Sequence, residues 1–249
     1  MMARRSLTAG IVVSMLIGAS SIAHAQDPAP LSSPWSVDLG FGMDNSISGN
    51  INSSAIGRIN NQAVVILKNS YEDVYGTGLH FRLGGGYMLD DTTEVRATFT
   101  LQSLDADLTD MGDLGVSRLY GQYADYQSLG IDVGLREYMN ATETLRAYGE
   151  ATIGLAFIDE TDVILVAPAA NLGGNATDFY DKTTAFAFAI NVGVILPIAE
   201  QFGLFGQLGF RYVTGMSEID DIVGTGLETI NDNSSRWTLP LVIGVRARF

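Results

Sequence analysis

The sequence predicts an all-β fold, an eight-stranded antiparallel up-and-down transmembrane β-barrel, from three observations. Eight segments alternate apolar and polar residues with the period of two that a strand gives to its two faces. The connections between these segments alternate long and short, as in a barrel whose tight turns all lie at one end. The clearest segment, 236–249, is about twice as long as an ordinary strand, and a tilted strand of that length crosses about 25 Å of lipid.

The first four predicted strands are 35–43, 77–89, 93–104 and 119–139. In 35–43, every second residue from Trp35 to Met43 is apolar, and the residues between them are Ser, Asp and Gly. Strands 77–89 and 93–104 alternate in the same way and are joined by a tight turn of Asp and Thr residues. In 119–139 the alternation is clear only after Ser128, and we expect a β-bulge before that residue.

The last four predicted strands are 144–158, 184–196, 202–214 and 236–249, and each repeats the same alternation. Four long connections remain, at 44–76, 105–118, 159–183 and 215–235, and they contain −13 of the formal net charge of −14. We expect them to be external, acidic and solvated loops. The apolar run 63–67 inside the first connection is consistent with either a short helix or an extension of a strand beyond the membrane.

The amino-terminal residues have the pattern of an export signal. Arg4 and Arg5 precede an apolar run at 7–19, and small residues flank His24 before the cleavage site expected between Ala25 and Gln26. The apolar run is too short for a membrane-spanning helix. We therefore predict a signal peptide at 1–25, a short periplasmic leader at 26–34 and a barrel domain at 35–249 with four long external loops. Because the chain contains no cysteine, it has neither a disulfide framework nor a thiolate metal site.

Soluble β-proteins are the main alternative fold. A β-sandwich seldom needs eight strands this long, and a soluble lipocalin-type barrel would place its apolar residues inside. Here the polar face of the strands is rich in Gly and Ala, as a crowded lumen requires. Aromatic residues gather near the strand ends, as in the interfacial girdles of membrane barrels, at Trp35, Tyr87, Tyr138, Phe202, Tyr212, Trp237 and Phe249.

The face predicted to point into the lumen carries ten charged residues: Asp38, Arg82, Glu94, Arg96, Asp132, Arg136, Arg146, Glu150, Arg211 and Arg246. Eight strands enclose a space that side chains just fill. Because an unpaired buried ion costs several kcal/mol, these charges are expected to pair and to plug the barrel. Small inward residues could also leave a narrow water-filled passage for small solutes, and this remains the alternative interpretation.

Catalysis, metal binding and nucleic-acid binding have little support. His80 is the only histidine after the predicted cleavage site, and no nucleophilic Ser lies near it in the sequence. The aspartates of 105–113 fail the spacing of a calcium-binding EF-hand loop, because Asp110 stands where that loop needs Gly. The chain has no basic patch for phosphate groups. We predict that the protein is not an enzyme, has no cofactor and binds no nucleic acid.

The whole mature chain resembles small eight-stranded outer-membrane barrels: the membrane domain of outer membrane protein A, the opacity-type adhesins and the outer membrane protein W group. The resemblance rests on the strand pattern and on the terminal aromatic residue. It implies a location in the bacterial outer membrane and contact with its lipid and lipopolysaccharide. It also implies an assembly signal for the barrel assembly machinery, formed by Leu241, Ile243, Val245 and Phe249.

We therefore expect a structural or surface-interaction protein that acts through its external loops, with a narrow porin-like channel as the alternative. An external ligand would bind to those loops. We favour a monomer.

Overall fold

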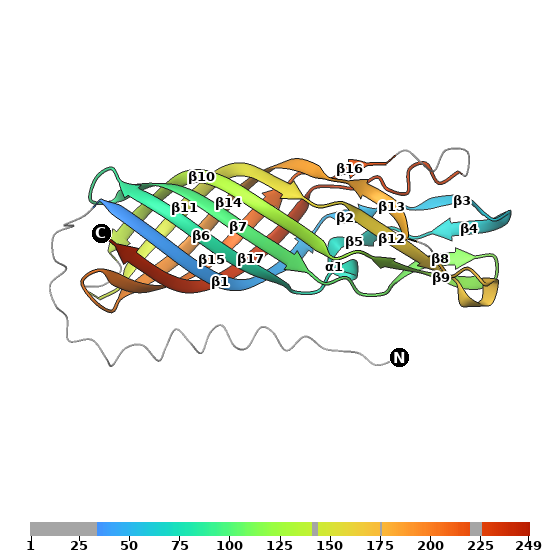
Figure 1. Ribbon diagram of the computed structural model, residues 1–249, viewed down its shortest axis with the longest axis horizontal. Helices are drawn as coiled ribbons and strands as arrows, with labels where there is room; N and C mark the ends of the chain where they lie inside the picture. Colours follow the sequence, from blue (N-terminus) through green and yellow to red (C-terminus); the bar gives the residue numbers. More distant parts are fainter. Residues whose placement is uncertain (1–33, 141–143, 175, 220–225) are drawn as a thin grey trace.

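Eight long strands close into a barrel in which all neighbouring strands are antiparallel (Figure 1). The computed structural model describes residues 34–140, 144–174, 176–219 and 226–249. The barrel strands are β1 (Trp35–Ser48), β6 (Gly78–Met88), β7 (Thr93–Leu104), β10 (Tyr126–Asn140), β11 (Arg146–Ile158), β14 (Thr183–Pro197), β15 (Phe202–Val213) and β17 (Arg236–Arg248). Each strand pairs with the next along the chain, and β1 closes the ring on β17. The predicted eight-stranded up-and-down barrel is confirmed.

The predicted signal peptide, its cleavage site at Ala25 and Gln26, and residues 26–33 of the leader lie outside the described residues. Within the described residues, no helix is long and apolar enough to cross a membrane.

The barrel wall turns its apolar side chains outward and its polar side chains inward. On β1, outward-facing Phe41 is 55% exposed and inward-facing Asp38 is 1% exposed. This distribution is the reverse of that in a soluble barrel. Aromatic pairs lie at both ends of the wall, with Trp35 packed on Tyr87 at one end and Trp237 on Tyr212 at the other.

One aromatic residue departs from the predicted girdle. Tyr138 is 4% exposed and points into the lumen, because it occupies an inward position of β10. The prediction that Tyr138 belongs to an interfacial girdle was wrong. That prediction used the nearness of Tyr138 to a strand end and overlooked that its position on the strand faces inward.

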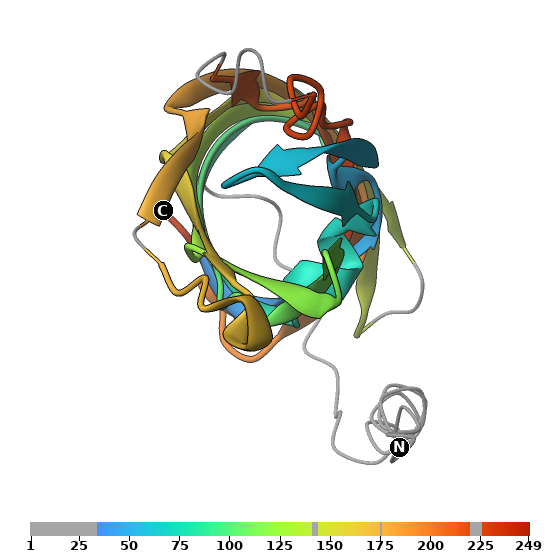
Figure 2. The same ribbon diagram turned by 90° about the vertical axis from the view of Figure 1, so that its right-hand side faces the viewer.

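Most of the long connections fold into a second β-structure, which we call the extension. It continues from the barrel end opposite the short turns (Figure 1). Its seven-stranded sheet has the order β16 (Ser217–Glu218), β13 (Ala176–Asp181), β12 (Thr161–Val166), β9 (Ser117–Tyr123), β8 (Thr109–Leu114), β4 (Gln62–Ile66) and β3 (Ala55–Ile59). Seen along the barrel axis, the hairpin of β3 and β4, coloured cyan, lies over the opening of the ring (Figure 2). The expectation of solvated loops was wrong for these segments.

Short elements complete the extension. Strands β2 (Asn50–Asn52) and β5 (Asn69–Ser70) pair with each other, α1 (Tyr71–Val74) follows β5, and the 3-10 turn η1 (Pro168–Ala170) follows β12. The helix begins with a capping box: the Ser70 hydroxyl accepts a hydrogen bond from the amide of Asp73, and the Asp73 carboxylate accepts one from the amide of Ser70.

The predicted single strand 119–139 is two strands in different sheets. Strand β9 pairs with β8 and β12 in the extension, whereas β10 pairs with β7 and β11 in the barrel. The alternation of apolar and polar residues is unclear before Ser128 because the chain changes from one sheet to the other there. The expected bulge within a single strand was wrong. The apolar run 63–67 largely coincides with β4, so the strand alternative was correct and the helix alternative was wrong.

Apolar clusters lie above and below the polar part of the lumen. The larger cluster fills the extension and the adjoining barrel end, and it includes Ile66, Leu104, Tyr126, Phe179 and Val213. The smaller cluster lies toward the short turns and consists of Met88, Tyr138, Tyr148, Ile195, Phe205 and Val242. The interior is therefore layered: apolar, charged and apolar.

Candidate functional site

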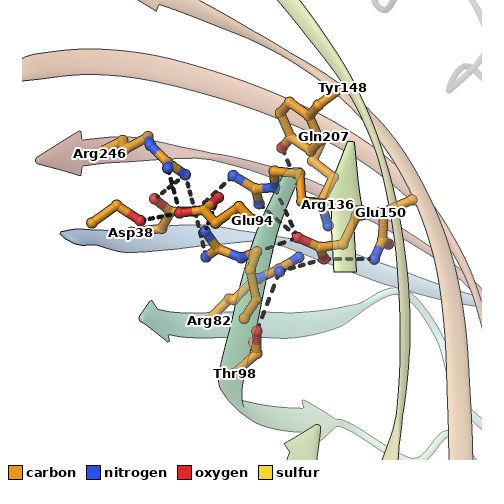
Figure 3. Close-up of polar contacts among 12 residues, drawn as sticks. Asp38, Arg82, Glu94, Thr98, Arg136, Tyr148, Glu150, Gln207 and Arg246 are labelled. Atoms are coloured by element: carbon orange, nitrogen blue, oxygen red, sulfur yellow. Dashed lines mark hydrogen bonds and ion pairs between the residues drawn. The ribbon is translucent and has the colours of Figure 1, made fainter. Parts of the chain in front are cut away.

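The candidate site is a network of charged side chains in the middle of the lumen. Strands β1, β6, β7, β10, β11 and β17 each direct at least one charged residue inward, because these residues share the inward parity of the wall. Its members are Asp38, Arg82, Glu94, Arg96, Arg136, Glu150 and Arg246, and none is more than 4% exposed. All of them except Arg96 are labelled in Figure 3.

Asp38 joins three strands across the lumen. Its carboxylate lies 2.6 Å from the guanidinium of Arg96 and 3.1 Å from those of Arg136 and Arg246. Arg136 comes from the far wall, 98 residues along the chain from Asp38. One carboxylate therefore holds arginines from β7, β10 and β17 together.

Glu150 plays the corresponding part on β11. It lies 2.5 Å from Arg82, 2.7 Å from Arg136 and 3.2 Å from Arg96, and it also accepts a 3.1 Å hydrogen bond from Asn191. Its two oxygens are thus surrounded by donors from four strands. Such saturation with hydrogen bonds is what a buried carboxylate requires.

Glu94 completes the network toward the short turns. It pairs with Arg246 at 2.6 Å and with Arg96 at 3.2 Å, and it accepts hydrogen bonds from the hydroxyls of Tyr138 and Ser36. Room for these large side chains comes from glycine on β6. A Cβ built on Gly86 would lie 2.0 Å from the Glu94 carboxylate, so only glycine fits at this position.

Two separate ion pairs lie closer to the extension. Arg211 pairs with Asp132 at 2.9 Å, and Arg236 pairs with Asp44 at 3.5 Å. The guanidinium of Arg236 also lies 4.5 Å from the centre of the Tyr126 ring. Arg236 thus lies between the polar lumen and the apolar interior of the extension.

The Asp44–Arg236 pair was missing from the predicted lumen. We expected the first strand to end at Met43, because the strict apolar alternation stops there, but β1 continues to Ser48. Asp44 therefore keeps the inward parity of Asp38. The alternation of apolar and polar residues in the last strand puts Arg236 on its polar face, and this pattern could have predicted that Arg236 lies in the lumen.

Among the described residues, Arg146 is the one predicted luminal residue that forms no ion pair. It is the first residue of β11 and donates a 2.5 Å hydrogen bond to the carbonyl of Asp91 in the short turn. Its guanidinium also covers the ring of Tyr138 at 3.9 Å. Arg146 thus lies at the rim of the barrel and reaches the network through Tyr138, whose hydroxyl donates a hydrogen bond to Glu94.

The packed side chains leave little open space in the lumen. A cavity of about 20 Å³ lies beside the network, lined by His80, Arg82, Thr98, Thr100, Asp132, Glu150, Thr152, Ala189, Asn191, Gln207, Arg211 and Pro240. A space of this size holds about one water-sized group. The apolar clusters on either side extend the filling toward both ends of the barrel.

His80 is buried inside the lumen. Its ring is 3% exposed and lies 3.4 Å from the Gln102 amide, among the luminal side chains. Within the residues the structure describes, no group of three or more His, Asp or Glu side chains is placed to hold a metal ion.

The outer surface of the extension is strongly acidic. Its solvent-facing acidic residues include Glu72, Asp73, Asp105, Asp107, Asp110, Asp113, Asp125, Asp159, Glu160, Asp162, Asp178, Asp181, Glu218, Glu228 and Asp232. Asp162 on β12 is directly opposite Asp178 on β13. Partial burial, together with the neighbouring carboxylates of Asp178 and Glu160, raises the pKa of Asp162 above its ordinary value.

Comparisons with known proteins give a likeness of fold alone. No family model matches the sequence, and no curated protein matches it. Among solved structures, Neisserial surface protein A is 14% identical, with a TM-score of 0.45, over 87% of this chain and 98% of that one. The attachment invasion locus protein Ail of Yersinia pestis, solved with the heparin analogue sucrose octasulfate, is 11% identical, with a TM-score of 0.37, over 85% and 98% of the two chains.

A third similar structure is an enzyme. The outer membrane protease OmpT of Escherichia coli is 8% identical, with a TM-score of 0.46, over 89% of this chain and 100% of that one. Similar barrels therefore include a protease as well as surface proteins. The chain resembles small outer-membrane β-barrels in fold, and its activity has to be argued from its own residues.

Proposed function

We propose that the protein is a non-enzymatic component of the bacterial outer membrane that interacts with partners outside the cell through its extension. The observation that carries this proposal is the contrast between a filled lumen and a folded, acidic extension. The barrel interior is occupied by ion pairs and apolar clusters, so the surface available for recognition is the outside of the extension. Loops carry function when a rigid scaffold holds them in place.

The outward apolar wall supports the proposed location in the membrane. Outward-facing residues such as Leu83, Phe99, Ile131 and Val192 are between 40% and 58% exposed, and water would not favour so continuous an apolar band. We propose contact of this band with outer-membrane lipid and of the barrel rim with lipopolysaccharide. A monomer is sufficient for both contacts.

The last strand supports the proposed route of assembly. In β17, Ile243 and Val245 face outward and are 67% and 48% exposed, and Phe249 after the strand is 60% exposed. Together with Leu241, they offer an apolar edge to the barrel assembly machinery before the strand pairs with β1.

The narrow channel is the competing function, and the packing disfavours it. A continuous water path would have to pass the network as well as both apolar clusters. Purified protein in planar lipid bilayers should give no stepwise currents. Reproducible single-channel steps would favour the channel instead.

The surface-interaction proposal is tested with two variants in whole cells. One replaces the extension with short turns, and the other neutralises exposed carboxylates by Asp113→Asn, Asp162→Asn and Asp178→Asn. Adhesion to immobilised extracellular-matrix proteins and to epithelial cells is measured beside wild type. A heat-modifiability gel shows that each variant is folded. Loss of adhesion in both variants is expected, and unchanged adhesion in both would refute the proposal.

A further inference from the structure

We propose that the luminal cavity is a binding site for one small monovalent anion of the chloride class. The site lies between Arg82 on β6 and Arg211 on β15. The inference rests on the charge, the hydrogen-bond donors and the size of this cavity. It is independent of the function proposed for the extension.

The charged layer of the lumen has more arginines than carboxylates among the described residues. Its buried arginines are Arg82, Arg96, Arg136, Arg211, Arg236 and Arg246, and its buried carboxylates are Asp38, Asp44, Glu94, Asp132 and Glu150. His80 adds no negative charge in either of its protonation states. An uncompensated charge in a closed interior is costly, so a counter-ion in this layer stabilises the fold.

The extra arginine belongs to the part of the network that borders the cavity. Arg211 is balanced by Asp132, and Arg236 is balanced by Asp44. The remaining four arginines share three carboxylates, and within the described part of the chain Arg82 has Glu150 alone as its ion-pair partner. Arg82 is also the member of that group whose side chain, with Glu150, lines the cavity.

The cavity wall is rich in hydrogen-bond donors. The Nε atoms of Arg82 and Arg211 are buried and have no hydrogen-bond partner, and both residues are at most 4% exposed. Gln207 accepts a hydrogen bond from Tyr148 through its amide oxygen, which leaves its NH₂ group to act as a donor. The hydroxyls of Thr98, Thr100 and Thr152 add further donors.

The wall also contains hydrogen-bond acceptors, among them Asp132 and Glu150. Both oxygens of Glu150 already face arginines. Oδ1 of Asp132 has no hydrogen-bond partner and lies near Gly154, where a Cβ would be 2.7 Å from it. The wall itself pairs two arginines with two carboxylates, and the extra arginine belongs to the network around it. An anion at this position, unlike a neutral water molecule, would compensate that charge.

The size of the cavity restricts the occupant. About 20 Å³ has room for one small group, which excludes polyatomic anions such as sulfate or phosphate. Apolar clusters lie on both sides of the charged layer. We expect the anion to bind as the barrel folds.

The test refolds the barrel from urea into detergent micelles with chloride, bromide or gluconate at equal ionic strength. For one site that binds the folded state alone, each tenfold rise in chloride above saturation raises the folding equilibrium constant about tenfold. Gluconate is too large for the cavity and should give a lower urea midpoint. Equal midpoints in chloride and gluconate would overturn the proposal.

Two test substitutions, Thr100→Asp and Asp132→Asn, and one control, Thr100→Ser, separate site binding from general salt effects. Thr100→Asp places a carboxylate in the cavity and should abolish the chloride dependence, whereas Thr100→Ser should keep it. Asp132→Asn removes a competing negative charge and should strengthen the dependence, which keeps the test decisive if Thr100→Asp does not fold. Unaltered chloride dependence in both variants would place the effect elsewhere.

Crystals of wild-type protein refolded in bromide provide a direct measurement. An anomalous peak within hydrogen-bond distance of Arg82 and Arg211 is expected. A water molecule without anomalous signal at that position would overturn the proposal.

Discussion

Removal of the Glu150 carboxylate should strongly destabilise the barrel. The side chain is 3% exposed and faces Arg82, Arg96 and Arg136 at 2.5 to 3.2 Å. In Glu150→Ala, four arginines of the network would share the two carboxylates of Asp38 and Glu94. Removing one partner from a buried ion pair typically costs about 3 to 5 kcal/mol. Because three arginines lose a partner together, we expect a loss near the middle of this range, or roughly a thousandfold in the folding equilibrium constant.

The assay is urea unfolding in lipid vesicles, followed by tryptophan fluorescence and by gel mobility. Glu150→Gln keeps the shape and one acceptor oxygen, so it should lose less stability than Glu150→Ala. Asp113→Ala is the matched surface control, since its ion pair with Arg118 is more than half exposed on both sides and lies in the extension. That change should cost less than about 1 kcal/mol.

A second substitution tests the cause. Buried ion pairs can often be replaced by apolar residues of similar volume without loss of stability. Adding Arg136→Met to Glu150→Ala should therefore recover part of the lost stability. A Glu150→Ala barrel as stable as wild type would refute the reasoning, because it would mean that water reaches the arginines through an open lumen.

Three further outcomes are expected. Phe249→Ser should leave export intact and lower the amount of heat-modifiable protein in the outer membrane, and equal amounts of folded variant and wild type would contradict the assembly signal. Asp178→Asn should raise the unfolding midpoint at neutral pH. Partial burial raises the pKa of Asp162 first, and the neighbouring carboxylates of Asp178 and Glu160 raise it further, so the folded state carries repulsion from Asp178 whenever Asp162 is ionised. As the pH falls through that pKa, Asp162 takes up a proton, so the difference in unfolding midpoint between the variant and wild type should shrink and disappear below about pH 4. A difference that stays constant with pH would exclude repulsion as the cause. Arg236→Met should increase proteolysis of the extension before that of the barrel, as its guanidinium joins Asp44 to the Tyr126 ring, and simultaneous cleavage of both parts would argue against a joining role.

The barrel itself could be predicted because one physical rule governs every wall strand. Lipid outside and a crowded lumen inside impose a period of two on each segment, and the eight segments could be counted directly from it. The same rule placed Asp38, Arg96 and Glu150 on the inward face. The partner of each charge could not be predicted in this way. Asp38 meets Arg136 across the lumen, and that contact depends on strand register and tilt, which the alternation does not determine.

The extension was missed because its strands are short and their alternation is weak. Strand β3 has five residues and includes Gly57 and Arg58. A local signal was nevertheless present in the sequence. Asn60 and Asn61 adopt positive φ angles of 50° and 65° and connect β3 to β4 in a two-residue turn, a conformation that asparagine tolerates well. Asparagine pairs between short apolar runs therefore indicate hairpins even where the flanking strands are only five residues long.

The shared sheet of the extension affects how its surface would be recognised by antibodies and competitors. Strand β8 pairs with β4, and β9 pairs with β12, so neighbouring patches of the surface come from three different connections of the chain. A synthetic peptide copying 105–118 lacks both neighbours and loses the pairing that shapes this region. Antisera raised against such linear peptides should bind denatured protein better than intact cells, whereas immunisation with the folded barrel should give antibodies against discontinuous epitopes.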